Sequence, residues 1–184
     1  MRLDAFKPAI ETYNIWSKNP SGSEESDDRS QFAIRGLDQS DVEEIESARP
    51  GYGASALRYF KDGHHGVGIV EEGKFIAFGW YYVNESDAKT CKVKGYHPLY
   101  PKHALLHADW VHPESRGRGL HHWLVTSRLN ALSRESSVRE IEAAIHPTNK
   151  PSEKSYSRAG FVVKRKLTVI TWLGFSIGRY HDEQ

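Results

Sequence analysis

The expected local structure changes twice along residues 104–124, ALLHADWVHPESRGRGLHHWL. An apolar run up to Val111 indicates a strand, a proline-containing turn follows, and the residues from Leu120 onward indicate the start of a helix. Gly117 and Gly119 lie between the turn and the helix. The first N–H groups of a helix have no internal partners, and the helix dipole adds partial positive charge there. The stretch therefore predicts an anion site that suits a phosphorylated cofactor.

Two arginines, Arg116 and Arg118, add full positive charge to this loop, and its glycines allow the backbone to approach a phosphate closely. The loop is not a P-loop, because the string G-x-x-x-x-G-K-[ST] does not occur. It is not the dinucleotide fingerprint G-x-G-x-x-G either, since His122 occupies the position of the third glycine. The alternative interpretation is an ordinary strand-to-helix turn with two solvated arginines.

The loop resembles the acyl-CoA loop of the GNAT superfamily of N-acetyltransferases, in which V-x-P and a short gap precede [RQ]-x-x-G-x-[GA]. Val111, Pro113, Arg116 and Gly119 occupy the fixed positions, and His121 stands where the family usually has Gly or Ala. A second pattern, N-x-x-S-x-x-x-Y-x-x-x-G-F over residues 149–161, matches every fixed position of the motif that follows the fifth strand of GNAT proteins. Two motifs in this order and separation identify the chain as GNAT-like.

The apolar patterns predict the element order β-α-α-β-β-β-α-β-α-β-β. In chain order, the predicted elements cover residues 31–37, 40–48 with a capping box at Ser40 and Glu43, 54–61, 67–70, 74–83, 104–111, 120–132, 140–145, 151–159, 161–167 and 168–173. Such an order implies an α/β fold with helices on the faces of a sheet. The resemblance, which covers roughly residues 31–175, implies a mixed and mostly antiparallel sheet.

We expect two parts along the chain: an N-terminal extension with a polar linker at residues 1–30, and a GNAT-like acyltransferase domain at residues 31–184. Residues 18–30 are polar, acidic and rich in Ser and Gly, as a linker would be. Residues 1–16 contain several apolar side chains and are interpreted as an extra strand or an arm that covers a sheet edge.

Composition narrows the class of protein. A chain of 184 residues can form one domain with a substantial core. Its formal charge of +1 argues against a nucleic-acid binder, which usually carries a basic excess. The single cysteine, Cys91, fits a reducing compartment, and the N-terminus shows no signal-peptide pattern. The longest apolar run, residues 75–83, is too short for a membrane helix. These features predict a cytoplasmic protein without a membrane span. The sequence leaves monomer and homodimer open.

Transfer of an acyl group from a thioester to an amine needs a polarised carbonyl, a deprotonated amine and a stabilised thiolate. By resemblance, Tyr156 is the candidate general acid, because a phenol with a reference pKa near 10 is protonated at neutral pH. The alternative is a core tyrosine packed between helix and sheet. His107 and Asp109 are the candidate bases, since strand alternation places them on one face. Each of the two could instead be a structural hydrogen-bonding group.

The resemblance also implies a set of contacts to acetyl-CoA or a related acyl-CoA. The backbone of residues 116–121 would wrap the pyrophosphate, and Trp110 and Val111 would lie beside the pantetheine. Arg118 is either a phosphate contact or a surface charge, and His121 either donates to the phosphate or points away. The full set of predicted cofactor contacts is Trp110, Val111, Arg116, Gly117, Arg118, Gly119, Leu120, His121, Asn149 and Ser152.

No metal is expected, because no H-E-x-x-H or Cys/His ligand spacing occurs, and the pairs His64-His65 and His121-His122 are interpreted as surface residues. The leading prediction is an acyl-CoA-dependent N-acetyltransferase that acts on an amine by direct transfer. One alternative is a catalytically idle domain that binds acyl-CoA as a sensor or a partner-docking module. Another alternative, a nucleic-acid binder that uses the R-G-R-G segment, fits the near-neutral charge poorly.

Overall fold

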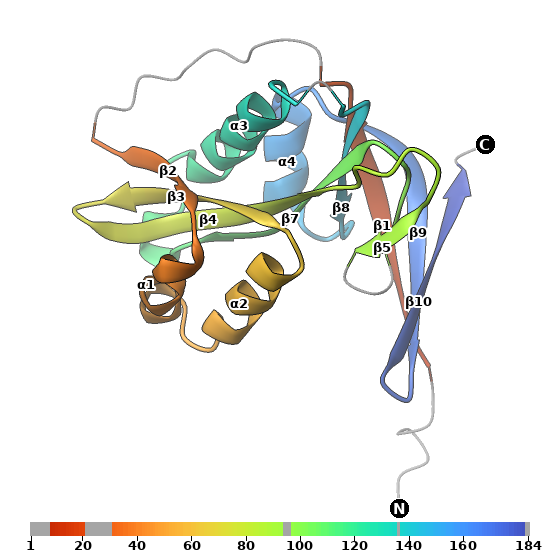
Figure 1. Cartoon of the computed structure of the whole chain (residues 1–184), viewed down its shortest axis with the longest axis horizontal. Helices are drawn as coiled ribbons and strands as arrows, with labels where there is room; N and C mark the ends of the chain where they lie inside the picture. The colour runs from red at the N-terminus through yellow and green to blue at the C-terminus, as the bar shows by residue number, and fades with distance from the viewer. Residues whose placement is uncertain (1–7, 21–30, 94–96, 136, 183–184) are drawn as a thin grey trace, which may run out of the picture.

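The computed structural model of the chain describes residues 8–20, 31–93, 97–135 and 137–182. An eight-stranded sheet in the order β10-β9-β1-β8-β7-β4-β3-β2 forms its centre (Figure 1). The strands are β1 (Ala9–Lys18), β2 (Ala33–Leu37), β3 (His65–Glu71), β4 (Lys74–Val83), β7 (His103–Val111), β8 (Glu140–Ile145), β9 (Val162–Trp172) and β10 (Phe175–Asp182). Only β7 and β8 run parallel, so the expected mixed, mostly antiparallel sheet is confirmed.

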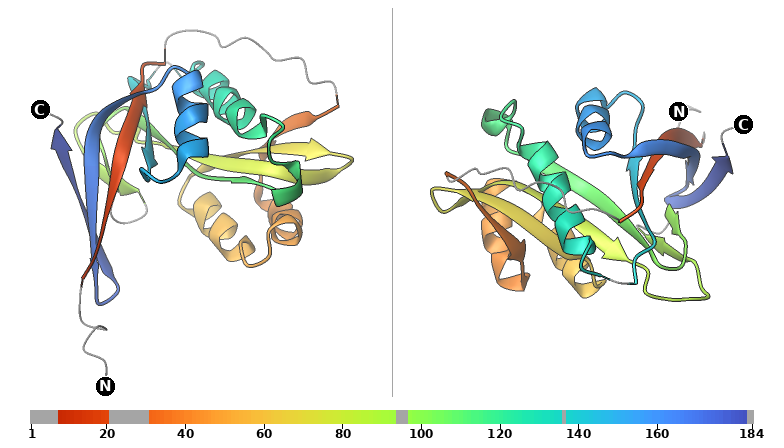
Figure 2. Two further views of the ribbon diagram at one scale, coloured as in Figure 1. Left: turned by 180° about the vertical axis from the view of Figure 1, so that it is seen from behind. Right: turned by 90° about the horizontal axis from the view of Figure 1, so that it is seen from above.

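Helices cover both faces of this sheet. α1 (Val42–Ala48) and α2 (Gly53–Lys61) lie on one face, and α3 (Leu120–Leu132) and α4 (Lys150–Arg158) lie on the other (Figures 1 and 2). Trp80 of β4 packs against α1 and α2, whereas Leu106 of β7 packs against α3 and α4. Each face therefore has its own apolar core, and a side chain on β7 enters one core or the other according to its face. A short separate sheet joins β5 (Cys91–Val93) to β6 (His97–Leu99).

The two parallel strands separate partway along their length. β7 pairs with β8 from His103–Glu140 to Leu106–Ala143. From His107 onward, β7 is paired only with β4 among the described strands. Beyond Leu106 and Ala143 the two strands are no longer paired with each other.

β7 also contains a bulge at the point of divergence. The register pairs Trp80 with His107 and Phe78 with Trp110, so two residues of β7 lie opposite Gly79. One of them, Ala108, has a φ of 56°, in the left-handed region. A bulge of this kind puts consecutive residues on the same face and reverses the alternation beyond it.

The bulge overturns one prediction. His107 and Asp109 do not share a face: His107 lies on the side of α2, and Asp109 lies on the side of α3 and α4. The alternation rule assumes an unbroken strand, and the extra residue at Ala108 breaks it.

Residues 9–18, which the sequence analysis placed in an extension, form β1 in the interior of the sheet. β1 pairs with β8 on one side and with β9 on the other, so both of its edges are used. Ile15 is fully buried between the two neighbouring strands in a small core with Leu167 and Val169. The segment is thus an integral strand and does not cover an edge.

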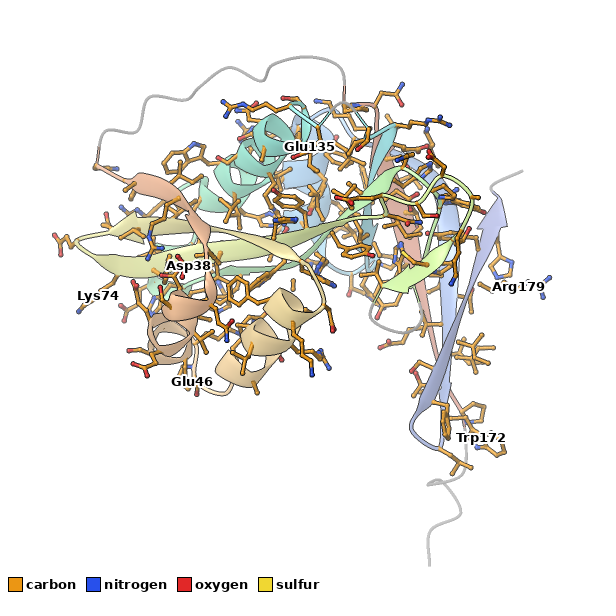
Figure 3. All side chains as sticks on the ribbon, in the orientation of Figure 1. Asp38, Glu46, Lys74, Glu135, Trp172 and Arg179 are labelled. Atoms are coloured by element: carbon orange, nitrogen blue, oxygen red, sulfur yellow. The ribbon has the colours of Figure 1, made fainter. Side chains whose placement is uncertain are left out.

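Two local predictions were wrong. The first cap is formed by Asp38 and Asp41, which bracket a short 3₁₀ turn (Gln39–Asp41) before α1, and not by Ser40 and Glu43. The two final strands predicted at 161–167 and 168–173 are one continuous strand, β9, because the hairpin turn lies later, at Leu173-Gly174, where both residues have positive φ. Figure 3 shows Trp172 at the end of this hairpin, which projects away from the helices.

Candidate functional site

A cleft of about 640 Å³ opens on the α3–α4 side of the sheet, above the ends of the diverging strands. Its wall is formed by the end of β7, the glycine loop with the first turn of α3, and one face of α4. The lining residues predicted from the sequence are Asp109, Trp110, Val111, Arg116, Gly117, Gly119, Leu120, His121, Asn149 and Ser152. The structure thus gathers ten of the thirteen predicted site residues around one cavity.

The glycine loop has the backbone conformation of a helix cap. Gly117 and Gly119 have φ values of 80° and 76°, which side-chain-bearing residues rarely adopt. Gly119 is the N-cap of α3, and the N–H of Trp123 is bonded to its carbonyl oxygen at 3.2 Å. The N–H groups of the first turn therefore precede the first intrahelical hydrogen bond and point toward the cleft end of the helix. This geometry suits an anion.

Positive charge in the cleft comes from two elements. Arg116 contributes from the loop, and Lys154 and Arg158 contribute from α4. Sequence analysis missed Lys154 and Arg158, although their spacing of four residues places them on one helical face with Ser155 and Pro151. Among the described residues that line the cleft, Asp109 is the only acid.

Arg118 lies outside this cleft. Its guanidinium forms two hydrogen bonds with the carboxylate of Glu71, at 2.5 and 2.8 Å, and lies over the ring of Phe32. The pairing lowers the pKa of Glu71 through the hydrogen bonds from Arg118. Of the two roles left open for Arg118, the structure shows the surface ion pair.

Asn149 and Ser152 form the cap of α4. The side-chain oxygen of Asn149 accepts a hydrogen bond from the N–H of Ser152 at 3.3 Å, and Pro151 occupies the first turn, where its missing N–H costs nothing. The cap fixes the direction in which α4 leaves β8. Tyr156, one turn beyond Ser152 on α4, donates a hydrogen bond to Asp109, which lines the cleft.

Asp109 is the centre of the polar groups on this side of the sheet. One carboxylate oxygen, Oδ2, accepts a hydrogen bond from the hydroxyl of Tyr156 at 2.9 Å and lies 3.0 Å from Nε2 of His121. The other oxygen, Oδ1, lies 2.6 Å from Nη1 of Arg128, a fully buried side chain of α3. A carboxylate can only accept, so His121 is held with its proton on Nε2.

These contacts shift two pKa values in opposite directions. Burial opposes the charge of Asp109, but the ion pair with Arg128 and the hydrogen bond from His121 outweigh it and hold the pKa of Asp109 well below its usual value. Burial and the negative charge of Asp109 raise the pKa of Tyr156 well above that of a free phenol. At neutral pH the carboxylate is charged and the phenol keeps its proton.

Gly79 leaves the room that this ion pair needs. A Cβ on Gly79 would lie 2.6 Å from Oδ1 of Asp109 and 2.8 Å from Nη1 of Arg128. Arg128 also donates to the backbone oxygens of Trp80 and Leu124, so its guanidinium is fixed in place. Sequence analysis missed Arg128, because its charge in the middle of an apolar helix was the only signal.

His107 lies on the opposite face of the sheet and meets a residue that was expected on the surface. Nε2 of His107 lies 2.8 Å from Nδ1 of His64, and both side chains are buried, at 7% and 8% exposure. The prediction that His64 is a surface residue was therefore wrong, whereas His65 beside it is exposed. The sequence holds no local sign of the pair, because its members lie on different elements.

A second, smaller cavity of about 180 Å³ lies on this face, beside His107 and Ala108. Its other lining residues are Tyr13, His97, Leu105, Leu106 and Ala144. They belong to β1, β6, β7 and β8, so this cavity borders the same divergence of strands as the large cleft. The two cavities approach the bulge from opposite faces.

A buried carboxylate, Glu142 of β8, organises the region behind the second cavity. It contacts Arg165 at 2.5 Å, His103 at 2.7 Å and the hydroxyl of Tyr180 at 3.0 Å. Burial would raise the pKa of Glu142, but hydrogen bonds with His103 and His97 and the charge of Arg165 lower it to about 2. The cluster ties β8, β9 and β10 to the loop that carries β6.

Within residues 8–20, 31–93, 97–135 and 137–182, no three His, Cys, Asp or Glu side chains gather as metal ligands would. None of the helices in these ranges is long and apolar enough to cross a membrane.

Comparison with solved structures shows the same fold in proteins of low sequence identity. A Drosophila protein is 19% identical, with a TM-score of 0.67 over 93% of this chain, and this chain spans about half (54%) of that one. A ribosomal-protein-alanine N-acetyltransferase from Brucella melitensis biovar Abortus 2308 is 17% identical, with a TM-score of 0.53 over 70% of this chain and 90% of that one.

A third neighbour, the aminoglycoside N-acetyltransferase AAC(6')-Iy in complex with CoA, is 20% identical, with a TM-score of 0.51 over 71% of this chain and 91% of that one. A search of curated protein sequences gave no match. The model of the acetyltransferase (GNAT) family matches residues 26–161, which include both sequence motifs, the glycine loop and α4. The chain belongs to the GNAT family of acetyltransferases.

Proposed function

We propose that this protein is an N-acetyltransferase that transfers an acetyl or other short acyl group from acyl-CoA to an amine. The observation that carries the proposal is the cleft at the divergence of β7 and β8, which combines a glycine-capped helix start with three cationic side chains. Acyl-CoA carries phosphates at one end and a thioester at the other. The cleft offers phosphate-binding groups, and Asp109 in its wall accepts a hydrogen bond from Tyr156.

The residues of the cleft fit the phosphate end of acyl-CoA. A Cβ on Gly117 would meet no atom within 4 Å, so the loop leaves open space against its backbone. The N–H groups of the first turn of α3 and the guanidinium of Arg116 would hold the pyrophosphate, and Lys154 and Arg158 would hold further phosphate. Bound there, acyl-CoA supplies the acyl group and a thiolate leaving group.

His107 is the better of the two candidate bases. Asp109 is already engaged by Arg128, His121 and Tyr156, and its depressed pKa makes it a weak proton acceptor. His107 carries an imidazole, whose reference pKa lies near neutral pH, and lines the smaller cavity on the other face. We assign removal of the amine proton to His107 and electrostatic positioning to Asp109.

Tyr156 is the proposed donor to the departing thiolate. Its hydroxyl donates to Asp109, which keeps the phenol protonated and defines where its proton lies before the reaction. To protonate or stabilise the thiolate, the hydroxyl must turn from Asp109 toward the sulfur. His121 remains bonded to the same carboxylate oxygen, so Asp109 does not lose all of its donors in that step.

The test is release of free thiol from acetyl-CoA in the presence of a panel of amines, with mass spectrometry of the products. The panel contains amino acids, polyamines, amino sugars and peptides. Acylated product from at least one amine supports the proposal. Tight CoA binding without turnover toward any amine would favour the sensor instead.

A charge-reversal pair tests the cleft itself. Arg158→Glu should weaken CoA binding by at least tenfold in calorimetry, because it places a carboxylate where a phosphate would lie. Arg134→Glu changes the same charge at an exposed position just after α3 and outside the cleft, so it should leave CoA affinity unchanged. Equal affinities for the two variants would contradict the proposed cofactor site.

A further inference from the structure

The pair His64–His107 lies in an aromatic enclosure on the α2 side of the bulge. Tyr59 of α2 stacks on His64, with ring centres 5.1 Å apart and planes at 19°, and meets His107 edge-on at 5.0 Å. Tyr82 of β4 lies 4.9 Å from His64, and Trp80 packs behind Tyr59. Two phenols, one from α2 and one from β4, thus lie against the imidazole pair, and His97 of β6 lines the same small cavity as His107.

The position of His64 is fixed by the way α2 ends. Gly63 takes a φ of 77°, and the N–H of His64 then bonds back to the carbonyl oxygen of Tyr59 at 2.9 Å. A glycine in this conformation after a helix is a common stop signal. Here it brings the imidazole of His64 under the ring of Tyr59 and against His107.

The 2.8 Å contact between the two rings requires a shared proton. A neutral imidazole has one N–H donor and one acceptor nitrogen, so one ring donates through the bridge and the other accepts. Two imidazolium ions could not make this contact, because both would be donors. The pair can therefore take up one proton beyond its neutral state, and this proton belongs to the pair as a whole.

We propose that His64 and His107 act as one proton-sharing dyad, in which His64 takes the positive charge when His107 accepts a proton from the amine. In the starting state, Nε2–H of His107 donates to Nδ1 of His64. As Nδ1 of His107 forms a bond to the proton leaving the amine nitrogen, the bridging proton moves to Nδ1 of His64. One N–H bond breaks at the amine, one forms at His107, and the bridging bond changes sides.

This transfer moves the charge by one side chain, away from the reacting centre and onto a ring stacked on Tyr59. An aromatic face attracts a cation, which offsets part of the cost of charging a buried imidazole. The dyad rests on the proposed role of His107 as the base. It adds a positioning and proton-sharing residue, His64, that neither sequence motif contains.

Nitrogen-15 NMR of histidine-labelled full-length protein tests the dyad without any need for turnover. In the parent, the rings of His64 and His107 should titrate together with one shared midpoint. In His64→Phe, His107 should titrate alone, with a midpoint lower by about one pH unit, because the charge of a buried imidazolium is no longer shared with a second ring. An unchanged midpoint for His107 in this variant would overturn the proposal.

Kinetics of a conservative variant separate proton sharing from positioning. The amide of His64→Asn reaches the place of Nδ1 and can keep a hydrogen bond to His107, but it cannot take a proton. We expect the acidic limb of the pH profile of kcat/KM to shift by the same amount in His64→Asn and His64→Phe. At neutral pH, kcat/KM should be lower by about tenfold, and the KM for acyl-CoA should be unchanged. If the acidic limb of the kcat/KM profile in His64→Asn lay at the same pH as in the parent, His64 would be only a structural partner of His107. That result would overturn proton sharing.

His65→Phe is the matched control, since His65 is the next residue, is exposed and stacks on Tyr81 outside the enclosure. This variant should leave unchanged both the midpoint of the His107 titration and the acidic limb of the pH profile of kcat/KM. If His64→Phe does not fold, His64→Asn alone decides both measurements. If the parent shows no turnover toward any amine, the proposed function fails, and the NMR titration still decides whether the dyad exists.

Discussion

The two faces of β7 at the bulge carry buried polar groups of different kinds. On the α3–α4 side, Asp109 and Arg128 form an ion pair whose charges are fixed over the whole range from weakly acidic to basic pH. On the α2 side, Nδ1 of His64 and Nε2 of His107 lie 2.8 Å apart and form the proposed dyad. One face therefore carries a charged ion pair, and the other carries two buried imidazoles in contact.

In the proposed mechanism, this difference lets one strand serve two steps of a proton-transfer reaction. A general acid needs an environment that keeps its proton in place, and the fixed charge of Asp109 does this for Tyr156. A base needs an environment in which its proton can move. The bulge separates the two environments although His107 and Asp109 are only two residues apart.

Loss of the ion pair between Asp109 and Arg128 should have the largest effect on stability among these variants. Arg128→Met leaves the carboxylate of Asp109 buried without its cation, and we expect the free energy of unfolding to fall by about 3–5 kcal/mol. Urea unfolding followed by tryptophan fluorescence measures the change. The double variant Arg128→Met with Asp109→Asn should recover part of the loss, because no uncompensated charge remains.

The control for this variant is Arg118→Met, which breaks the exposed pair with Glu71. Solvent already screens that pair, so its unfolding curve should nearly overlie that of the parent. Similar losses in Arg118→Met and Arg128→Met would show that burial of the Asp109 pair does not set its importance.

The cluster around Glu142 is a third group of buried polar side chains, and here the carboxylate contacts histidines. Glu142 has a pKa of about 2 in the folded protein, below the unfolded value near 4.3. Its contribution to stability is therefore complete above the unfolded value and is lost as the pH falls toward 2, by about 3 kcal/mol. The difference in unfolding free energy between the parent and Glu142→Gln should be largest at pH 6 and should narrow as the pH falls. A constant difference from pH 6 to pH 2 would contradict the low pKa of Glu142.

The chemical role of the fixed-charge face is tested by removal of one hydroxyl. Tyr156→Phe takes away the donor to Asp109 and leaves the ring in the core, so packing should survive. We expect kcat and kcat/KM to fall together by about 10–10³-fold, with acyl-CoA affinity nearly unchanged. Steady-state kinetics and calorimetry measure the two quantities, and full activity would remove Tyr156 from the mechanism.

The smallest expected effect comes from steric pressure on the ion pair. Gly79→Ala would push a methyl group into Asp109 and Arg128, and we expect a loss of about 1–3 kcal/mol in unfolding free energy. Gly36→Ala, at a strand position where an added Cβ meets no atom within 4 Å, is the matched control and should be neutral. Equal effects at both glycines would mean that the loss reflects the strand backbone and not the ion pair.

Much of the fold could be predicted because its signals are local. The residues of α3 were predicted with the bounds that the structure shows, since a glycine cap and a long apolar run define both ends. The helix expected at 151–159 was displaced by one residue, because Asn149 caps it. The motifs also named most of the residues that line the cleft, but not Arg118 correctly, because its partner Glu71 lies on a distant strand.

The geometry of the candidate site could not be predicted, because it depends on contacts between distant elements. Alternation along residues 104–111 gives no sign of the bulge, which arises where β7 leaves β8 while remaining paired with β4. The partner of His107 is determined by the end of α2, and the partner of Asp109 lies in the middle of α3. Contacts between residues that are distant in the sequence leave no signal in a local sequence pattern.

The interior position of β1 has a consequence for the order of folding. β1 is made early in synthesis, yet it pairs Ala9 with Thr171 and Asn14 with Ile145, so its partners on both sides are made late. The strands from β2 to β7 and the helices between them can pair while β1 still has no neighbour. Contacts between such distant segments form slowly, because a long loop must close before they are gained. Until β9 is made, the edge of β1 that β9 will cover stays open, and in that interval the nascent chain can pair with another chain there.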